Sequence, residues 1–212
     1  MIDIDTAYTI TAFATMLVVI DPVAIAPLFL ALTQGMRPEQ RRRIAVRATL
    51  TAAFVLAIFA FFGEAVLGFI GISMPAFRIA GGVLLFLTAL DMLFDRRTKR
   101  REDRAHHEDD DHDPSVFPLA IPLIAGPGAI ASIILLIGEK PGGEGLITIL
   151  GITALTLVLM LVVLILSPRL DQMIGKTGID VITRILGMLL AALSVQFVLD
   201  GLSAYGFGPG TG

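Results

Sequence analysis

The run Ala7–Leu32, AYTITAFATMLVVIDPVAIAPLFLAL, decides the fold class. It is apolar on every face and contains a single charged residue, Asp21, near its middle. A helix of about 20 such residues crosses the hydrocarbon core of a bilayer, which is about 30 Å thick. Because backbone polar groups in lipid must be paired within the segment, the run predicts a transmembrane helix.

Five further apolar runs of similar length follow, separated by short polar connections. Charged residues make up only 17% of the chain, against roughly 25% in soluble proteins. The sequence therefore predicts an all-α, polytopic protein that lies in the lipid bilayer. The six predicted spans are Ala7–Leu32, Ala45–Ile70, Pro75–Phe94, Val116–Gly138, Leu146–Leu166 and Val181–Ala204.

The basic residues are distributed unevenly among the connections. Fourteen of the 16 Lys and Arg residues follow the first, third or fifth span, and only Arg78 and Lys140 lie on the other side. The positive-inside rule places the basic connections in the cytoplasm and both termini outside it. Because Met1–Asp5 lacks the basic region of a cleavable signal peptide, the first run is interpreted as a retained span.

Two motifs recur at nearly the same spacing. The sequence IDPVAI from Ile20 corresponds to AGPGAI from Ala125, 105 residues later, and RIAG from Arg78 corresponds to RILG from Arg184, 106 residues later. Chance recurrence of short motifs is the alternative, but two matches at one offset favour a duplication. Three spans per unit is an odd number, so the second three-helix repeat would have inverted topology, as in many secondary transporters.

The linker between the two predicted repeats is strongly charged. It is basic in its first half, and its second half holds His106, His107 and His112 among Asp and Glu residues. Such charge density is typical of a solvated, disordered linker. A divalent-metal sensor is an alternative, because imidazole and carboxylate groups bind metals. The predicted segments are a first repeat 1–94, a cytoplasmic linker 95–115, a second repeat 116–204 and an extracytoplasmic tail 205–212.

The first and fourth spans contain helix-breaking residues near their middle. Proline costs about 3 kcal/mol inside a helix, and flanking glycines add backbone freedom. The N–H and C=O groups exposed at a break have partial charges that suit a carboxylate and a cation. A proline kink without any site is the simpler alternative. The predicted substrate- or ion-binding residues are Asp21, Pro22, Pro27, Gly126, Pro127 and Gly128.

Asp21 is the most informative of these residues. A carboxylate at the centre of a membrane helix costs roughly 2.5–3.5 kcal/mol, so it usually faces a cavity and has a function. Asp21 could bind a substrate ammonium group, carry a coupling H⁺ or Na⁺, or simply cap the half-helix that begins at Pro22. These roles are compatible. The secondary candidates are Thr88, Asp91 and Gln196, of which Thr88 and Gln196 could bond between helices.

Several function classes are excluded or disfavoured. The absence of Cys excludes disulfides, thiolate metal sites and a Cys nucleophile. A net charge of −3 and the absence of a recognition motif argue against a nucleic-acid partner. No ATP-binding loop is present. With Asp21 as the one carboxylate near mid-bilayer, we expect no enzyme, no catalytic residue, no metal and no cofactor beyond a coupling ion.

Three motifs together resemble the MarC family. They are Asp21-Pro22-x4-Pro27-Leu-Phe29, Leu32-Thr-x-Gly35 and Pro122-Leu-x-Ala-Gly-Pro-Gly-Ala-Ile130. The resemblance implies a six-span protein of the inner membrane, and its SnatA-like branch implies H⁺- or Na⁺-coupled transport of small neutral amino acids. At Ala24-Ile25 the chain departs from the family's usual Gly-Asn, which removes a polar group. A regulatory membrane protein that acts through its linker is the alternative, and a homo-oligomer remains open.

Overall fold

The computed structural model describes residues 6–94 and 114–207, and every regular element in these ranges is a helix. Five helices are long and apolar enough to cross a membrane, and the bent pair η1–α6 gives a sixth span. The predicted all-α, polytopic architecture is therefore confirmed. Almost all of the predicted linker falls outside the described residues. In chain order the helices are α1 (Thr6–Ile20), α2 (Pro22–Leu32), α3 (Pro38–Ile70), α4 (Met74–Leu93), η1 (Ser115–Ile124), α6 (Pro127–Glu139) and α7 (Gly143–Ala204).

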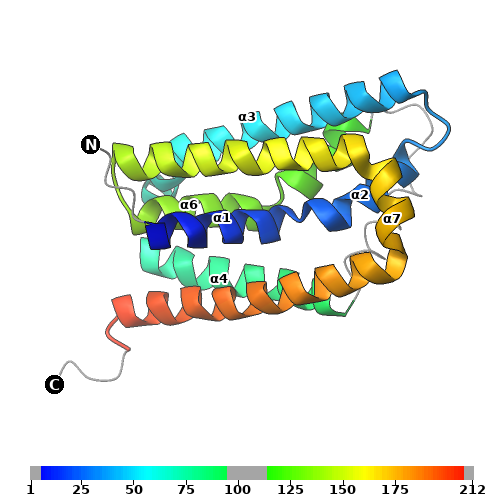
Figure 1. The fold of residues 1–212 in the computed structure, drawn as a ribbon. Coiled ribbons are helices and arrows are strands. Elements are labelled where there is room, and N and C mark those ends of the chain that lie inside the picture. Colours follow the sequence, from blue (N-terminus) through cyan, green and yellow to red (C-terminus); the bar gives the residue numbers. More distant parts are fainter. Residues whose placement is uncertain (1–5, 95–113, 208–212) are drawn as a thin grey trace.

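Helix α6 lies at the centre of the bundle. Every residue from 131 to 136 is buried, as expected for a helix that is apolar on all faces. On one side, a Cβ atom added at Gly63 of α3 would lie 2.5 Å from Ile134. On the other side, a Cβ atom added at Gly81 of α4 would lie 2.8 Å from Leu135. Figure 1 shows α1 and α6 side by side between α3 and α4.

Helix α7 is two spans joined by a bend. The spans are Gly143–Arg169 and Thr177–Ala204, and Gly175 between them has the left-handed backbone angles φ 65° and ψ 170°. Figure 1 shows the first span running along α3 and the second running along α4. The second span packs so closely on α4 that a Cβ atom at Gly82 would lie 2.8 Å from the Ser194 carbonyl oxygen.

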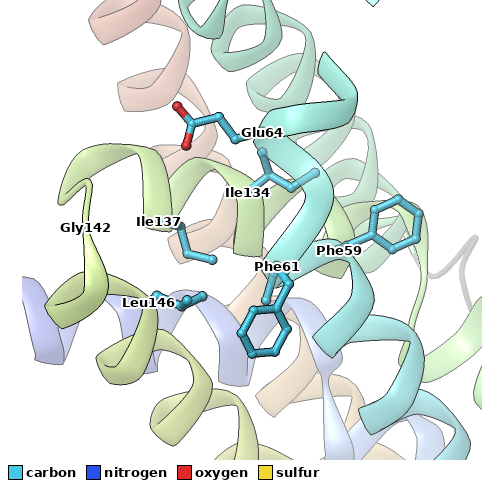
Figure 2. Close-up of a pocket in the computed structure, with 8 residues that line it drawn as sticks. Phe59, Phe61, Glu64, Ile134, Ile137, Gly142 and Leu146 are labelled. Carbon is cyan, nitrogen blue, oxygen red and sulfur yellow. The ribbon is translucent and has the colours of Figure 1, made fainter. Parts of the chain in front are cut away.

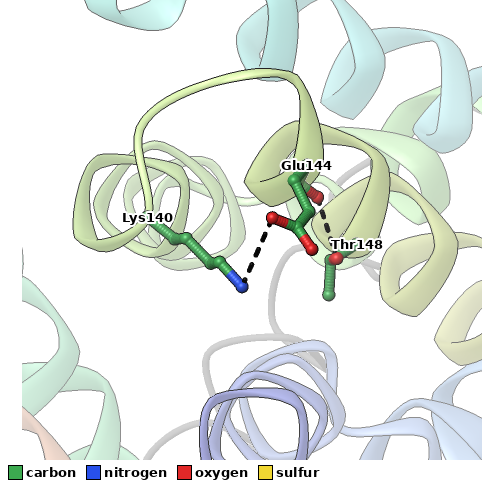
Figure 3. Close-up of polar contacts among 3 residues, drawn as sticks. All are labelled: Lys140, Glu144 and Thr148. Atoms are coloured by element: carbon green, nitrogen blue, oxygen red, sulfur yellow. Dashed lines mark hydrogen bonds and ion pairs between the residues drawn. The ribbon is translucent and has the colours of Figure 1, made fainter. Parts of the chain in front are cut away.

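The described chain begins and ends at the same end of the bundle, opposite the connection between α2 and α3 (Figure 1). At this end the Ser73 and Tyr205 hydroxyl groups are 2.7 Å apart, which ties the start of α4 to the end of α7. The connection between α6 and α7 is held by an ion pair of 3.8 Å between Lys140 and Glu144 (Figure 3). Thr148 Oγ1 also donates a hydrogen bond to the Glu144 carbonyl oxygen.

Candidate functional site at the two helix breaks

The first break is formed by Asp21, between α1 and α2. Its backbone is left-handed, with φ 53° and ψ 67°, and it is the only non-glycine residue with positive φ in the described ranges. Such strain costs of order 1–3 kcal/mol and is typical of functional sites. The side chain is fully buried, and its Oδ1 accepts a hydrogen bond of 3.2 Å from the Ala24 N–H. The predicted helix cap is therefore present, with Pro22 at the first helical position.

The second break lies between η1 and α6, whose axes differ by 49°. Helix η1 is a wide, irregular turn with non-helical backbone angles at Phe117 and Ile121. Gly126 is extended and caps α6, which begins at Pro127. A Cβ atom added at Gly126 would overlap the carbonyl oxygen of Pro122, so only glycine fits here.

The two breaks lie against each other. A Cβ atom added at Gly128, in the first turn of α6, would be 3.3 Å from Val19 Cγ1, two residues before Asp21. The same point is 3.8 Å from Thr88 Oγ1 on α4. The structure thus brings the sequence-predicted residues of the first and fourth spans together, and it adds Thr88 from the third.

The other predicted residues are less central. Pro27 lies inside α2 and is half-buried, more than one turn beyond the break. Asp91 is half-buried on α4, about one turn beyond Thr88. Gln196 is exposed, and its Nε2 donates a hydrogen bond of 2.8 Å to Asp200 on the same helix.

Thr88 and Gln196 both bond within their own helices and not between helices. Thr88 Oγ1 donates to the Leu84 carbonyl oxygen of α4, as Gln196 donates within α7. In each case the acceptor lies four residues away, one helical turn along the chain, and is therefore within reach without any contact from a neighbouring helix.

Two functional candidates are absent from the sequence-based set. Ser132 is fully buried in α6, one turn after Gly128, and its hydroxyl has no hydrogen-bond partner within the described ranges. Glu64 is a second carboxylate inside an apolar run, on α3. The signal that singles out Asp21, one polar residue among apolar neighbours, is also present at both positions.

Chemically, the breaks combine groups of both signs. The N-termini of α2 and α6 carry partial positive charge, which suits an anionic group such as a carboxylate. The Asp21 carboxylate suits a cation or an ammonium group. Within the described ranges, no group of three or more His, Asp or Glu residues is placed to hold a metal ion. The three His residues of the linker lie outside those ranges.

Comparison with known proteins agrees with this architecture. Residues 6–205 match the MarC family of integral membrane proteins. A UPF0056 membrane protein of Archaeoglobus fulgidus is 36% identical over 200 residues, covering 93% of each chain. The UPF0056 inner membrane protein YhgN of Escherichia coli is 32% identical over 195 residues, covering 91% of this chain and 95% of its own. No solved structure matches the chain.

Proposed function

We propose that this chain, which belongs to the MarC family of integral membrane proteins, is a secondary transporter of small neutral amino acids or similar small solutes. The observation that carries the proposal is the fully buried, left-handed Asp21 at a helix break that packs against a second break. Non-helical backbone at membrane depth is tolerated where it lines a cavity or is buried in protein. Paired breaks of this kind bind substrates in many carriers.

A zwitterion matches the charges at the breaks. Its ammonium group would bind the Asp21 carboxylate, and its carboxylate would lie at the N-terminus of α6 near Gly128. The unpartnered Ser132 hydroxyl is available as a further hydrogen-bond donor. Asp21 or the exposed backbone carbonyls would carry the coupling H⁺ or Na⁺. We therefore assign the protein the role of a carrier and not that of an enzyme.

Uptake into proteoliposomes tests this function directly. Purified protein should accumulate labelled glycine or alanine when an inward H⁺ or Na⁺ gradient is imposed, and the matching ionophore should abolish accumulation. Counterflow with an unlabelled amino acid inside the vesicles should accelerate uptake. Folded protein that moves no small amino acid under either gradient would refute the proposal.

Deletion of residues 102–113 separates the carrier from a protein that signals through its linker. A carrier whose site lies at the helix breaks should keep its transport rate within about twofold, because surface connections tolerate deletion. The matched control replaces the same residues with an uncharged linker of equal length. Loss of transport in the deletion and in the control would show that the function depends on the charged linker, as the regulatory alternative requires.

The proposed orientation places both termini outside the cytoplasm of the plasma membrane. The chain has no native Cys, so a single introduced cysteine is the only thiol that the reagent can label. Cysteines replacing the exposed Thr6 and Ser203 should react with an impermeant maleimide in intact cells. A cysteine replacing Thr98, beyond the described residues, should react only after permeabilisation. Labelling with the reverse pattern would reject both the orientation and the positive-inside interpretation.

A further inference from the structure

Glu64 is a charged residue in the apolar part of α3. It is the only charged residue between Leu50 and Ile72. Six more helical residues follow it, so its Cα lies about 9 Å inside the end of the helix at 1.5 Å per residue. A carboxylate within an apolar membrane segment is costly, and such residues usually have a partner or a function.

A cavity of about 180 Å³ adjoins Glu64 where α3, α6 and the start of α7 meet. Figure 2 shows the Glu64 carboxylate and the Phe61 ring at opposite edges, with Ile134, Ile137 and Leu146 between them. An engineered apolar cavity of about 150 Å³ holds benzene, so this one accommodates a group of similar size.

No cation of the described ranges neutralises Glu64, which has neither an ion pair nor a hydrogen-bond partner there. Lys140 belongs to the connection that borders the cavity through Gly142, but its Nζ is paired with Glu144 (Figure 3). The carboxylate is therefore available to a ligand. Because the other cavity walls are aromatic and aliphatic, a complementary ligand has one positive charge and an apolar body.

We propose that this cavity binds an ammonium group carried on an apolar chain. The ammonium group pairs with Glu64, and the apolar body that follows it lies against Ile134, Ile137 and Leu146 and reaches the Phe61 ring at the opposite edge (Figure 2). A free amphipathic amine fits better than a phospholipid, whose phosphate would be brought close to the carboxylate.

Calorimetric titration tests the site without any transport assay. The probe is decyltrimethylammonium, added to protein in dodecyl maltoside micelles, with empty micelles and uncharged decanol as blanks. Glu64→Gln should raise the Kd at least tenfold, because it keeps the shape and removes the charge. Glu39→Gln, which removes a carboxylate from the exposed first turn of the same helix and outside the cavity, should leave the Kd unchanged.

Equal affinity in Glu64→Gln and the native protein would overturn the proposal, as would equal binding of decanol. The melting temperature of Glu64→Gln should hold or rise, since an intramembrane charge is removed, so a change in Kd would not result from unfolding.

Competition by added phosphatidylethanolamine would assign the site to a lipid headgroup, and the absence of competition would assign it to a free amine. If Glu64→Gln instead separates a dimer and leaves binding intact, the face is an interface between copies. None of these binding results tests the proposed transport site at the two helix breaks.

Discussion

Asp21→Asn is expected to reduce transport in proteoliposomes roughly ten- to hundredfold while the protein folds as before. The loss corresponds to about 1.5–3 kcal/mol, the usual contribution of a hydrogen bond to a charged group. Stability should hold or rise, because a buried intramembrane charge disappears. Asn also retains the local structure, since it caps helices as well as Asp and tolerates the left-handed backbone. The measurements are initial uptake rates and the melting temperature of each purified variant.

Two control variants separate the loss of the Asp21 charge from other effects of substitution. Asp180→Asn removes a carboxylate from an exposed position of α7 and should leave transport unchanged. Asp21→Ala removes the charge, the Ala24 cap and the tolerance for positive φ together, so it should lose stability as well as transport. Native transport in Asp21→Asn would show that Asp21 is only a helix cap. The binding site would then be restricted to the second break.

Gly126→Ala is expected to have the largest effect on stability. Its Cβ atom would overlap the carbonyl oxygen of Pro122, which is backbone and cannot rotate away. Overpacking of this kind costs about 1–3 kcal/mol and at times more. The folded fraction that survives heating in detergent, followed by size-exclusion chromatography, should therefore fall sharply.

Gly151→Ala is the matched control for that substitution. Gly151 lies in the helical first span of α7, and no atom lies within 4 Å of the point where its Cβ atom would stand. Replacing a helical glycine with alanine in open space stabilises by roughly 0.5–1 kcal/mol, so this variant should survive heating better than the native protein. Equal behaviour of the two alanine variants would mean that the second break does not have the geometry described above.

Hydropathy predicted the membrane spans well but not the ends of the helices. Helix α3 begins at Pro38 and not near Ala45, because the arginines at its start favour helix although they lie outside the apolar run. The connection expected between the fifth and sixth spans is also helical, except for the bend at Gly175. Prolines 118 and 122 explain why η1 is irregular. The superposition of the two repeats stays a prediction.

The candidate site was predictable in composition but not in geometry. Proline and glycine marked both breaks, since each removes or loosens helical hydrogen bonds wherever it occurs. The left-handed conformation of Asp21 and the contact between Val19 and Gly128 depend on tertiary packing. The pattern of apolar residues along one segment does not show that packing. Ser132 and Glu64 show the same signal as Asp21, one polar residue among apolar neighbours, but the sequence does not show that Ser132 is buried without a partner or that Glu64 borders a cavity.

The close packing of α4 on the second span of α7 limits how this molecule can move. At Gly82 and again at Gly201, a backbone carbonyl lies within 3.0 Å of where a Cβ atom would stand. Helices in such contact cannot slide past one another. In a carrier with alternating access, α4 and the second span of α7 would therefore move together as one rigid unit. Gly175, with its left-handed φ between the two spans of α7, is the natural hinge for that movement.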